Sequence, residues 1–284
     1  MIADNQTEKV YLSSRLELDE EFKPVCKFII KEFEKIGIEY EFLNLTNDIW
    51  VRDYMPIQVS ENKFIEFHYD PDYLQTTKKR YRNLKTYPDI VCDKHNIKTI
   101  KSGIILDGGN VVKSSDCVIL TEKIFIENKY NYTKNQLIDN LQELFETDKI
   151  IFIPWFKDVT EEFCGHSDGM VRFIDDNTVL INHIYRNEKS VLNPLLKAGL
   201  ECKCLNFEVK KEHKDNWAYL NFLQTKNILL ITKLGIDEDD QAINQISDCF
   251  PEYASKNRII QVPDMEPIVS KGGALNCISW TIKV

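Results

Sequence analysis

Hydrophobic and polar positions along the chain follow two alternating patterns. Over residues 22–36, apolar side chains recur every three or four positions, as on the buried face of a helix, and Gly37 follows as a residue that commonly ends helices. Residues 38–43 then alternate between apolar and polar side chains, as in a half-buried strand. Because strands and amphipathic helices continue to alternate to the C-terminus, the pattern predicts an α/β fold.

Polar loops separate the predicted strands at nearly regular intervals. Those that contain Asp53, Asp107, His166 and Cys277 are separated by 54, 59 and 111 residues, and the last spacing is about twice the first. One interval after His166, a fifth strand–loop–strand passage includes residues 217–221. Each repeat of about 55 residues reads approximately as ββαβ, which is too short to bury its own apolar faces without neighbours. The spacing therefore predicts five units packed around a shared centre, where their loops meet.

The length and composition favour one soluble domain over residues 1–284. The 284 residues contain no Pro/Gly/Ser-rich linker, and 43% hydrophobic and 29% charged residues are ordinary values for a globular protein. The N-terminal sequence lacks the basic and apolar regions of a signal peptide, and no apolar run approaches the roughly 18 residues of a membrane span. Eight scattered cysteines are typical of reduced thiols. We therefore expect a cytoplasmic protein.

The net charge and the spacing of the Cys and His residues limit the kinds of partner that we expect for this chain. A net charge of −9 weakly disfavours nucleic acid and anionic membranes, which both select basic surfaces, and it is compatible with a cationic small molecule. Cys202, Cys204 and His213 have an irregular spacing for a zinc site. We expect no nucleic-acid or membrane partner, no metal and no cofactor.

Cys277 and His166 are the candidate nucleophile and proton carrier. A thiolate is a strong nucleophile, and an imidazole can supply and remove protons as a reaction proceeds. Gly272 and Gly273, just before the cysteine, would let backbone amides approach a ligand closely. The alternative is that Cys277 is a small hydrophobic residue of the core. We favour catalysis because the cysteine falls on the same interval as the other polar loops.

Three aspartates occupy corresponding places in the repeats and point to a cationic substrate. Asp53, Asp107 and Asp168 would converge at the centre, where carboxylates beside a thiolate repel one another unless a cation enters. A guanidinium fits such a site because it is planar, permanently charged and able to donate paired N–H groups. Alternatively each aspartate caps a turn, but three in the same phase make this explanation less favourable. Trp50 could stack on the cation or pack in the core.

These residue types define a hypothetical mechanism. Asp53 and Asp168 hold the guanidinium with its central carbon over the sulfur of Cys277, which attacks that carbon. His166 protonates the departing nitrogen as ammonia and then activates water, which converts the covalent thiouronium to a ureido product and frees the thiol. Asp107 would hydrogen-bond to His166 and keep the ring oriented.

The five motif stretches jointly resemble the agmatine deiminase family, in the guanidine-modifying superfamily that also holds the arginine and peptidyl-arginine deiminases. They occur in family order, extend from about residue 40 to the end, and comprise residues 47–53, 107–110, 165–168, 218–222 and 272–277. The resemblance implies a five-bladed pseudosymmetric α/β propeller, the pentein fold, that deiminates a small guanidine substrate without a cofactor. It also implies a possible homodimer, since many members form dimers or larger assemblies.

The resemblance assigns a role to each matching residue. It implies that Cys277 is the nucleophile, that His166 is the general acid/base, and that Asp107 is the partner of the histidine. Asp53 and Asp168 would bind the guanidinium. The further candidates for substrate binding are Trp50, Asn110, Gly272 and Gly273.

Departures from the family pattern leave the substrate open. The second motif begins with Asp107 where the family usually has Glu, and Asn276 stands where agmatine deiminases commonly have His. The family's Trp/Gly-rich segment after the first motif is missing, and the chain is shorter. Arg80 and Arg82, in the segment found there instead, could bind a substrate carboxylate, which would favour arginine or a C-terminal peptidyl-arginine over agmatine. Otherwise they belong to a solvated basic segment.

Three functions are therefore compatible with the sequence. A hydrolase that deiminates agmatine or a close relative is the leading hypothesis. An amidinotransferase would use the same covalent intermediate but pass the amidino group to an amine. A non-catalytic propeller that binds a partner, as ribosome-associated members of this fold do, would not need Cys277, His166 and the three aspartates together.

Overall fold

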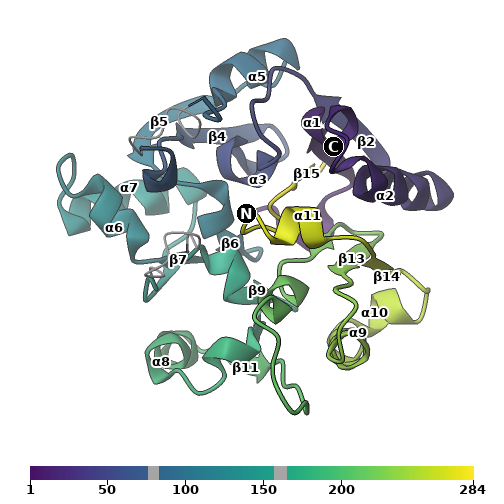
Figure 1. Ribbon diagram of the computed structural model, residues 1–284. Helices are drawn as coiled ribbons and strands as arrows, with labels where there is room; N and C mark the ends of the chain where they lie inside the picture. The colour runs from purple at the N-terminus through teal and green to yellow at the C-terminus, as the bar shows by residue number, and fades with distance from the viewer. Residues whose placement is uncertain (76–82, 157–164) are drawn as a thin grey trace.

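Among residues 1–75, 83–156 and 165–284, which the computed structural model describes, five three-stranded sheets surround a common centre (Figure 1). In each sheet the first two strands are antiparallel, and the third runs parallel to the middle strand. Strand by strand, the sheets are β3 (Ile57–Ser60), β4 (Lys63–His68) and β5 (Ile100–Ile105); β6 (Val112–Lys113), β7 (Cys117–Thr121) and β8 (Lys149–Ile153); β9 (Val171–Phe173), β10 (Thr178–Ile181) and β11 (Glu201–Cys204); β12 (Leu223–Gln224), β13 (Leu229–Thr232) and β14 (Ile259–Val262); and β15 (Ser279–Ile282), β1 (Lys9–Ser13) and β2 (Glu39–Leu43).

The last of these sheets joins the two ends of the chain and closes the ring. β15 pairs antiparallel with β1, with Trp280 opposite Tyr11, and the two aromatic rings lie 4.9 Å apart. Trp280 Nε1 donates to the backbone oxygen of Pro56 at 2.7 Å, which ties this sheet to the sheet that begins with β3. Closure gives every unit a neighbour on both sides, as short repeats require to bury their apolar faces.

Helices connect the middle strand of each sheet to its parallel third strand, because parallel pairing needs a crossover connection. The connecting helices are α1 (Arg15–Leu18) and α2 (Lys23–Ile36), α5 (Pro88–Lys94), α6 (Lys123–Asn128) and α7 (Lys134–Phe145), α8 (Lys189–Lys197), and α9 (Asp239–Cys249) and α10 (Pro251–Ala254). The ββαβ order predicted for each repeat is therefore confirmed.

α2 illustrates how the sequence pattern becomes packing. Its apolar stripe buries Val25, Ile29 and Phe33 in a cluster that includes side chains of β1, β12, β13 and β14. Gly37 ends the helix with a left-handed φ of 81°, and its N–H donates to the backbone oxygen of Phe33 at 2.8 Å. A residue with a Cβ would be strained in that conformation. β2 follows from Glu39, which confirms the predicted strand.

Short helical turns carry the chain across the centre of the ring, from the third strand of each sheet to the first strand of the next. These crossings are α3 (Val51–Tyr54) after β2, η3 (Gly108–Asn110) after β5, η4 (Ser167–Gly169) after β8, η6 (Asn216–Tyr219) after β11, and α11 (Glu266–Val269) with the following turn after β14. Each crossing carries one of the sequence motifs, so the fold gathers five distant stretches at one place.

The helices of this protein are short. α2, with 14 residues, is the longest helix in the described segments. None of the helices in the part of the chain that the structure describes is long and apolar enough to cross a lipid bilayer. Further single-turn elements in the described residues are η1 (Asp4–Gln6), η2 (Asp72–Leu74) and η5 (His183–Tyr185).

Candidate active site

The motif residues of the central crossings come together around Gly109. The backbone N–H of Gly109 donates to Asp53 Oδ1 at 3.1 Å. A Cβ at this position would lie 2.5 Å from Asp53 Oδ1, 2.7 Å from His166 Nδ1 and 3.5 Å from Asp168 Oδ2. Only glycine fits here, because the neighbouring side chains approach the backbone more closely than a Cβ allows.

His166 lies between two of the aspartates. Its Nε2 atom is 2.9 Å from Asp107 Oδ2, and its Nδ1 atom is 3.6 Å from Asp53 Oδ1. Burial by itself favours the neutral ring, but the charge of Asp53 and the hydrogen bond with Asp107 outweigh it and raise the pKa of His166 above its ordinary value. A ring that keeps its proton at near-neutral pH is able to act as an acid.

Asp107 is a buried carboxylate with a buried cation beside it. Lys123 Nζ lies 2.6 Å from Asp107 Oδ2, the oxygen that also contacts His166. Burial favours the protonated acid, but Lys123 and His166 outweigh it and hold the pKa of Asp107 below its usual range, so the carboxylate is ionised. Although aspartate is one methylene shorter than glutamate, its oxygen lies within hydrogen-bond distance of the His166 ring.

Asp168 is held by two asparagine side chains. Asn221 Nδ2 and Asn276 Nδ2 donate to Asp168 Oδ2 at 2.9 and 2.7 Å. The same oxygen lies 3.8 Å from Cys277 Sγ. Because Oδ2 already accepts two amide donors, the other oxygen of Asp168 is the better placed to accept an N–H group from a ligand.

Cys277 lies two residues before β15, and hydrogen bonds hold its backbone and its sulfur. Its Sγ atom is 3.3 Å from Asn221 Oδ1, and its backbone N–H donates to the same oxygen at 3.3 Å. The N–H of Arg52 donates to the backbone oxygen of Cys277 at 3.1 Å. The residue is 9% exposed. One asparagine therefore fixes both the sulfur and the carboxylate of Asp168.

The pKa of Asp53 is raised by burial and by the negative charges that accumulate in the site. Burial raises the pKa of this carboxyl, and the charges of Asp107 and Asp168 raise it further. The positive charge of His166 offsets only part of these effects, so the pKa reaches about 6. A cation that enters between the aspartates would relieve this repulsion.

The structure explains why residues 272 and 273 are glycines without invoking a ligand. Gly272 adopts a left-handed φ of 89°, which favours glycine. A Cβ on Gly273 would overlap the six-membered ring of Trp50, so this glycine allows the indole to pack on the backbone. Trp50 itself is half-buried, and its backbone N–H donates to Asp48 Oδ1 at 3.0 Å. The expected contact of the glycine amides and the indole with substrate stays a prediction.

Asn110 braces the crossings around it. Its Oδ1 atom accepts hydrogen bonds from the backbone N–H and the hydroxyl of Thr121 at 3.0 and 2.8 Å, and from the N–H of Ser167 at 3.3 Å. These bonds join η3 to β7 and η4. Within the described residues its buried Nδ2 atom has no hydrogen-bond partner, and its expected contact with substrate stays a prediction.

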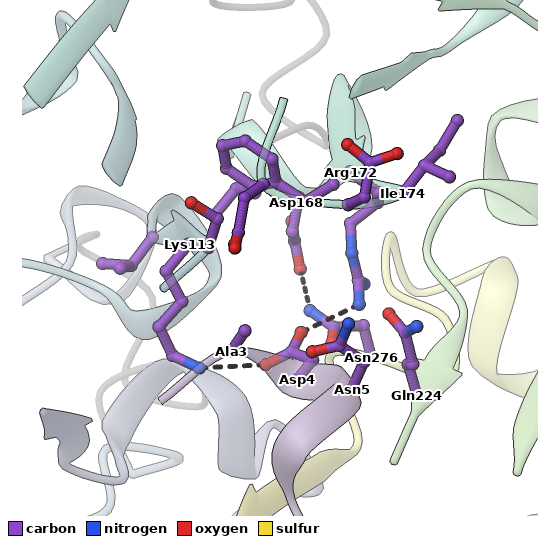
Figure 2. Close-up of a pocket in the computed structure, with 15 residues that line it drawn as sticks. Ala3, Asp4, Asn5, Lys113, Asp168, Arg172, Ile174, Gln224 and Asn276 are labelled. Atoms are coloured by element: carbon purple, nitrogen blue, oxygen red, sulfur yellow. Dashed lines mark hydrogen bonds and ion pairs between the residues drawn. The ribbon is translucent and has the colours of Figure 1, made fainter. Parts of the chain in front are cut away.

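A small cavity lies beside Asp168 and Asn276. Figure 2 shows Asp4 of η1 between Lys113 and Arg172, with ion pairs of 3.0 and 2.9 Å. The cavity measures about 20 Å³, which is room for about one water molecule and far too little for a guanidine substrate. Because Lys113 belongs to β6 and Arg172 to β9, these ion pairs fix the N-terminal turn between two sheets.

His, Cys, Asp and Glu, the residue types that commonly bind metal ions, occur throughout the fold. Over residues 1–75, 83–156 and 165–284, no group of three or more His, Cys, Asp or Glu side chains is arranged to hold a metal ion. Cys202 and Cys204 lie on β11, and His213 Nδ1 accepts the backbone N–H of Asp215 at 3.2 Å.

The sequence pattern predicts no role for three residues of the site, Asn221, Asn276 and Lys123. Asn221 and Asn276 lie within motif stretches, so their positions were visible, but their hydrogen-bond partners depend on the fold. Lys123 begins a helix outside the regular loops, and no sequence signal marked it. Arg80 and Arg82 fall in residues 76–82, outside the described residues, so their contact with a substrate carboxylate stays a prediction.

Comparison with known proteins identifies the relatives of this chain. The agmatine deiminase of Medicago truncatula is 22% identical over an alignment of 229 positions, which covers 66% of this chain and 60% of that protein. The chain spans about 60% of the length of the first curated relatives that it matches. The agmatine deiminase structure from Enterococcus faecalis aligns with a TM-score of 0.73 at 17% identity, covering 99% of this chain and 94% of that one. An amidinotransferase of saxitoxin biosynthesis from Microseira wollei aligns with a TM-score of 0.61 at 14% identity, covering 98% and 94%.

These structural likenesses confirm the five-bladed pseudosymmetric α/β propeller, the pentein fold, that the motif resemblance implied. The model of the Porphyromonas-type peptidyl-arginine deiminase family matches residues 5–282. Since that match spans nearly the whole chain and includes all five motif crossings, the chain belongs to the Porphyromonas-type peptidyl-arginine deiminase family.

Proposed function

We propose that this protein hydrolyses the guanidine group of a small cation, agmatine or a close relative, to a ureido product and ammonia. The observation that carries the proposal is the single buried site in which Cys277 Sγ lies 3.8 Å from Asp168 Oδ2, and His166 is held by Asp107 at 2.9 Å. A nucleophile, a cation-binding carboxylate and a proton carrier are the groups that deimination needs. The activity named for the relatives supports agmatine as the substrate.

Substrate binding would be electrostatic. Asp53 and Asp168 each present a carboxylate to the planar N–H groups of a guanidinium, which binds carboxylates in pairs. The bound cation would lower the pKa of Asp53 from about 6 and favour its ionised form. The same positive charge would favour the thiolate of Cys277, because an opposite charge nearby stabilises the charged form of a thiol.

In the first half of the reaction, the thiolate of Cys277 attacks the central carbon of the guanidinium. A C–S bond forms, and the π electron pair of the C=N bond moves to nitrogen, which gives a neutral tetrahedral adduct. His166, which enters protonated, donates its proton to one NH₂ group. The C–N bond breaks, ammonia leaves, and a cationic thiouronium remains on the sulfur while the ring is neutral.

In the second half, the neutral ring of His166 removes a proton from water. The resulting hydroxide adds to the thiouronium carbon, and a second tetrahedral adduct forms. This adduct collapses as the C–S bond breaks and the sulfur leaves as thiolate. The hydroxyl proton passes to solvent, where it converts ammonia to ammonium, so the products are the ureido compound and ammonium.

Substitution of the nucleophile tests the proposal. Cys277→Ser should abolish ammonia release from agmatine, whereas Cys249→Ser, which changes a partly exposed cysteine at the end of α9, should leave it unchanged. Mass spectrometry of acid-quenched wild-type enzyme should find the amidino group on the peptide that contains Cys277. Full turnover in Cys277→Ser would remove the cysteine from the mechanism.

The substrate screen should compare guanidines that differ in the group beyond the guanidine or in methylation of the guanidine. Agmatine, arginine, methylated arginines and peptides with C-terminal arginine would be assayed for ammonia release. The family name points to peptidyl-arginine and the named relatives point to agmatine, so the ratio of kcat/KM values decides between them. Arg80→Ala and Arg82→Ala would selectively lower turnover of the carboxylate-bearing substrates if these arginines bind the carboxylate. Product formation that requires an added amine would instead assign amidinotransferase activity.

We also propose a cytoplasmic homodimer without nucleic-acid or membrane partners. The net charge of −9 disfavours polyanionic surfaces. Each of the seven cysteines in the described segments is a free thiol, as in proteins of reducing compartments. Multi-angle light scattering of the purified protein measures its mass in solution, and a monomer mass at micromolar concentration would reject the dimer.

A further inference from the structure

Lys123 is a buried cation of the site that the proposed mechanism leaves unused. It is the first residue of α6, and its side chain is 0% exposed. Its ammonium nitrogen lies 2.6 Å from Asp107 Oδ2. The same oxygen lies 2.9 Å from His166 Nε2. One carboxylate oxygen therefore joins the ammonium of Lys123 to the proton carrier.

Two more carboxylates face the ammonium. Glu127, one helical turn later in α6, lies 3.2 Å from Lys123 Nζ through Oε1, and Asp72 of η2 lies 3.5 Å from it through Oδ1. A lysine ammonium is strongly hydrated in water, so its complete burial is unfavourable unless carboxylates neutralise its charge. Three separate chain segments supply these carboxylates, and one of them bears the partner of His166.

The arrangement differs from that of an ordinary structural ion pair. Among the described residues Asp107 Oδ1 has no hydrogen-bond partner, whereas Oδ2 contacts both Lys123 and His166. Since the two groups share one oxygen, a change in the ammonium acts directly on the hydrogen bond of the imidazole.

We propose that Lys123 is a positioning residue of this site, which keeps Asp107 turned toward His166 and limits how tightly the imidazole holds its proton. Its catalytic consequence rests on the proposed deiminase function, because His166 must first donate a proton and then accept one. Without the lysine, a ring that faces Asp53 and Asp107 would bind its proton too tightly to donate it readily.

The charges around His166 imply that substitutions of Lys123 and Glu127 shift the pKa of His166 in opposite directions. Burial and Lys123 disfavour the charged ring, whereas Asp53 and Asp107 favour it and outweigh them. Glu127 also interacts with His166, and burial together with Asp107 raises the pKa of Glu127 to about 7 despite Lys123. Removal of the positive charge of Lys123 should therefore raise the pKa of His166, and removal of the negative charge of Glu127 should lower it.

Titration of ¹⁵N-labelled histidines by NMR in the complete chain tests this without reliance on turnover. In Lys123→Met, the pKa of His166 should rise by about one unit, a tenfold tighter binding of the proton. In Glu127→Gln, it should fall. His183, whose partner is Glu212 at 3.2 Å, is an internal control whose titration should not change.

Steady-state kinetics provide the second measurement. In Lys123→Met, kcat should fall about 10- to 100-fold while KM changes little, since the lysine acts on proton transfer rather than on substrate binding. Lys123→Arg retains the charge and should recover part of the loss. Lys113→Met is the matched control, because it removes a buried lysine that pairs with Asp4 at 3.0 Å and should leave the pKa of His166 unchanged.

An unchanged or lowered pKa of His166 in folded Lys123→Met overturns the proposal. If circular dichroism shows that this variant does not fold, Glu127→Gln decides: a lowered pKa of His166 supports the proposal, and an unchanged or raised one overturns it. The titration needs no substrate. If the wild-type protein releases ammonia from no guanidine, the proposed function fails and the titration still decides the role of Lys123.

Discussion

Asn276 holds Asp168 from the position next to the candidate nucleophile, with its Nδ2 atom 2.7 Å from Asp168 Oδ2. Because Asn276 and Cys277 are adjacent in the chain, the backbone that places the sulfur also places an amide that orients Asp168, the carboxylate proposed to bind the guanidinium. Arg52 fixes this dipeptide, since its Nε and its backbone N–H donate to the backbone oxygens of Asn276 and Cys277 at 3.4 and 3.1 Å. The orientation of Asp168 is therefore coupled to the position of the nucleophile.

Asn276→Ala is expected to weaken substrate capture. It leaves Asp168 Oδ2 with Asn221 as its remaining amide donor. A hydrogen bond to a charged group contributes about 1.5–3 kcal/mol, so kcat/KM should fall about 10- to 100-fold. The measurement is steady-state ammonia release as a function of agmatine concentration.

The matched control for this substitution is Asn177→Ala, in the exposed turn between β9 and β10. It also truncates an asparagine to alanine, but the side chain is exposed, and kcat/KM should stay at the wild-type value. If Asn276→Ala keeps the same kcat/KM as this control, the amide does not orient Asp168 for catalysis.

Gly109→Ala is expected to inactivate the enzyme while the fold persists. The new Cβ would lie 2.5 Å from Asp53 Oδ1 and 2.7 Å from His166 Nδ1, so both side chains must move. A displacement of about 1 Å in a catalytic site can lower the rate about 100-fold, and we expect a loss of at least this size in kcat.

Gly169→Ala provides the comparison, because Gly169 also lies in a central crossing and its Cβ would meet no atom within 4 Å. This variant should keep nearly full activity. Equal activity in the two alanine variants would show that close packing around Gly109 does not control the chemistry.

The ring and its central residues could be predicted because each repeat places its motif at the same point of the unit. The crossing from the third strand of one sheet to the first strand of the next carries Asp53, Asp107 and His166 in turn, so regular sequence spacing becomes spatial convergence. Local patterns also predicted α2 and β2, since periodicity and the helix-ending Gly37 are properties of a few adjacent residues.

The sequence could not predict features that depend on contacts between distant segments. Lys123 looks like an ordinary charged residue at a helix start, and its burial depends on Asp72 and Asp107, which lie in other elements. Gly273 packs against the Trp50 ring, and a local Gly-Gly sequence does not show which distant side chain lies against it. The sequence gives the type of each residue, but only the fold shows which distant residues it contacts.

Cation binding should weaken as the pH falls through about 6. Asp53 has a pKa raised to about 6 by burial and by its neighbouring aspartates, so it takes up a proton in this range and loses its attraction for a guanidinium. Calorimetry with agmatine and Cys277→Ser, the variant expected to be inactive, should show constant affinity above about pH 7. Below about pH 6, affinity should fall by up to about tenfold per pH unit.

Asp53→Asn separates this titration from that of His166. The amide cannot ionise, so this variant should bind agmatine more weakly at all pH values and lose most of the decrease between about pH 7 and pH 5. A decrease as steep as that of the Cys277→Ser enzyme would assign the pH dependence to another group.

Asp48 is a buried acid that should lower the stability of the protein as the pH rises toward about 8. Its Oδ1 atom accepts the N–H of Trp50 at 3.0 Å, and its Oδ2 atom has no hydrogen-bond partner in the segments that the structure describes. Burial raises its pKa to about 8, with the charge of Asp53 adding to the shift and the Trp50 N–H opposing it. In the unfolded chain the pKa returns to about 3.9, so the folded state binds more protons between about pH 4 and pH 8.

Asp48→Asn should therefore gain stability over the wild-type protein as the pH rises. Since the folded state of the wild type keeps a proton that unfolding releases, its stability declines through this window, whereas the uncharged amide has no such term. Tm measured by calorimetry should show a difference between variant and wild type that is more positive at pH 8 than at pH 5. Asp139→Asn, at an exposed position of α7, should show no such trend. A difference for Asp48→Asn that is constant or shrinks with rising pH would mean that Asp48 is ionised in the folded protein.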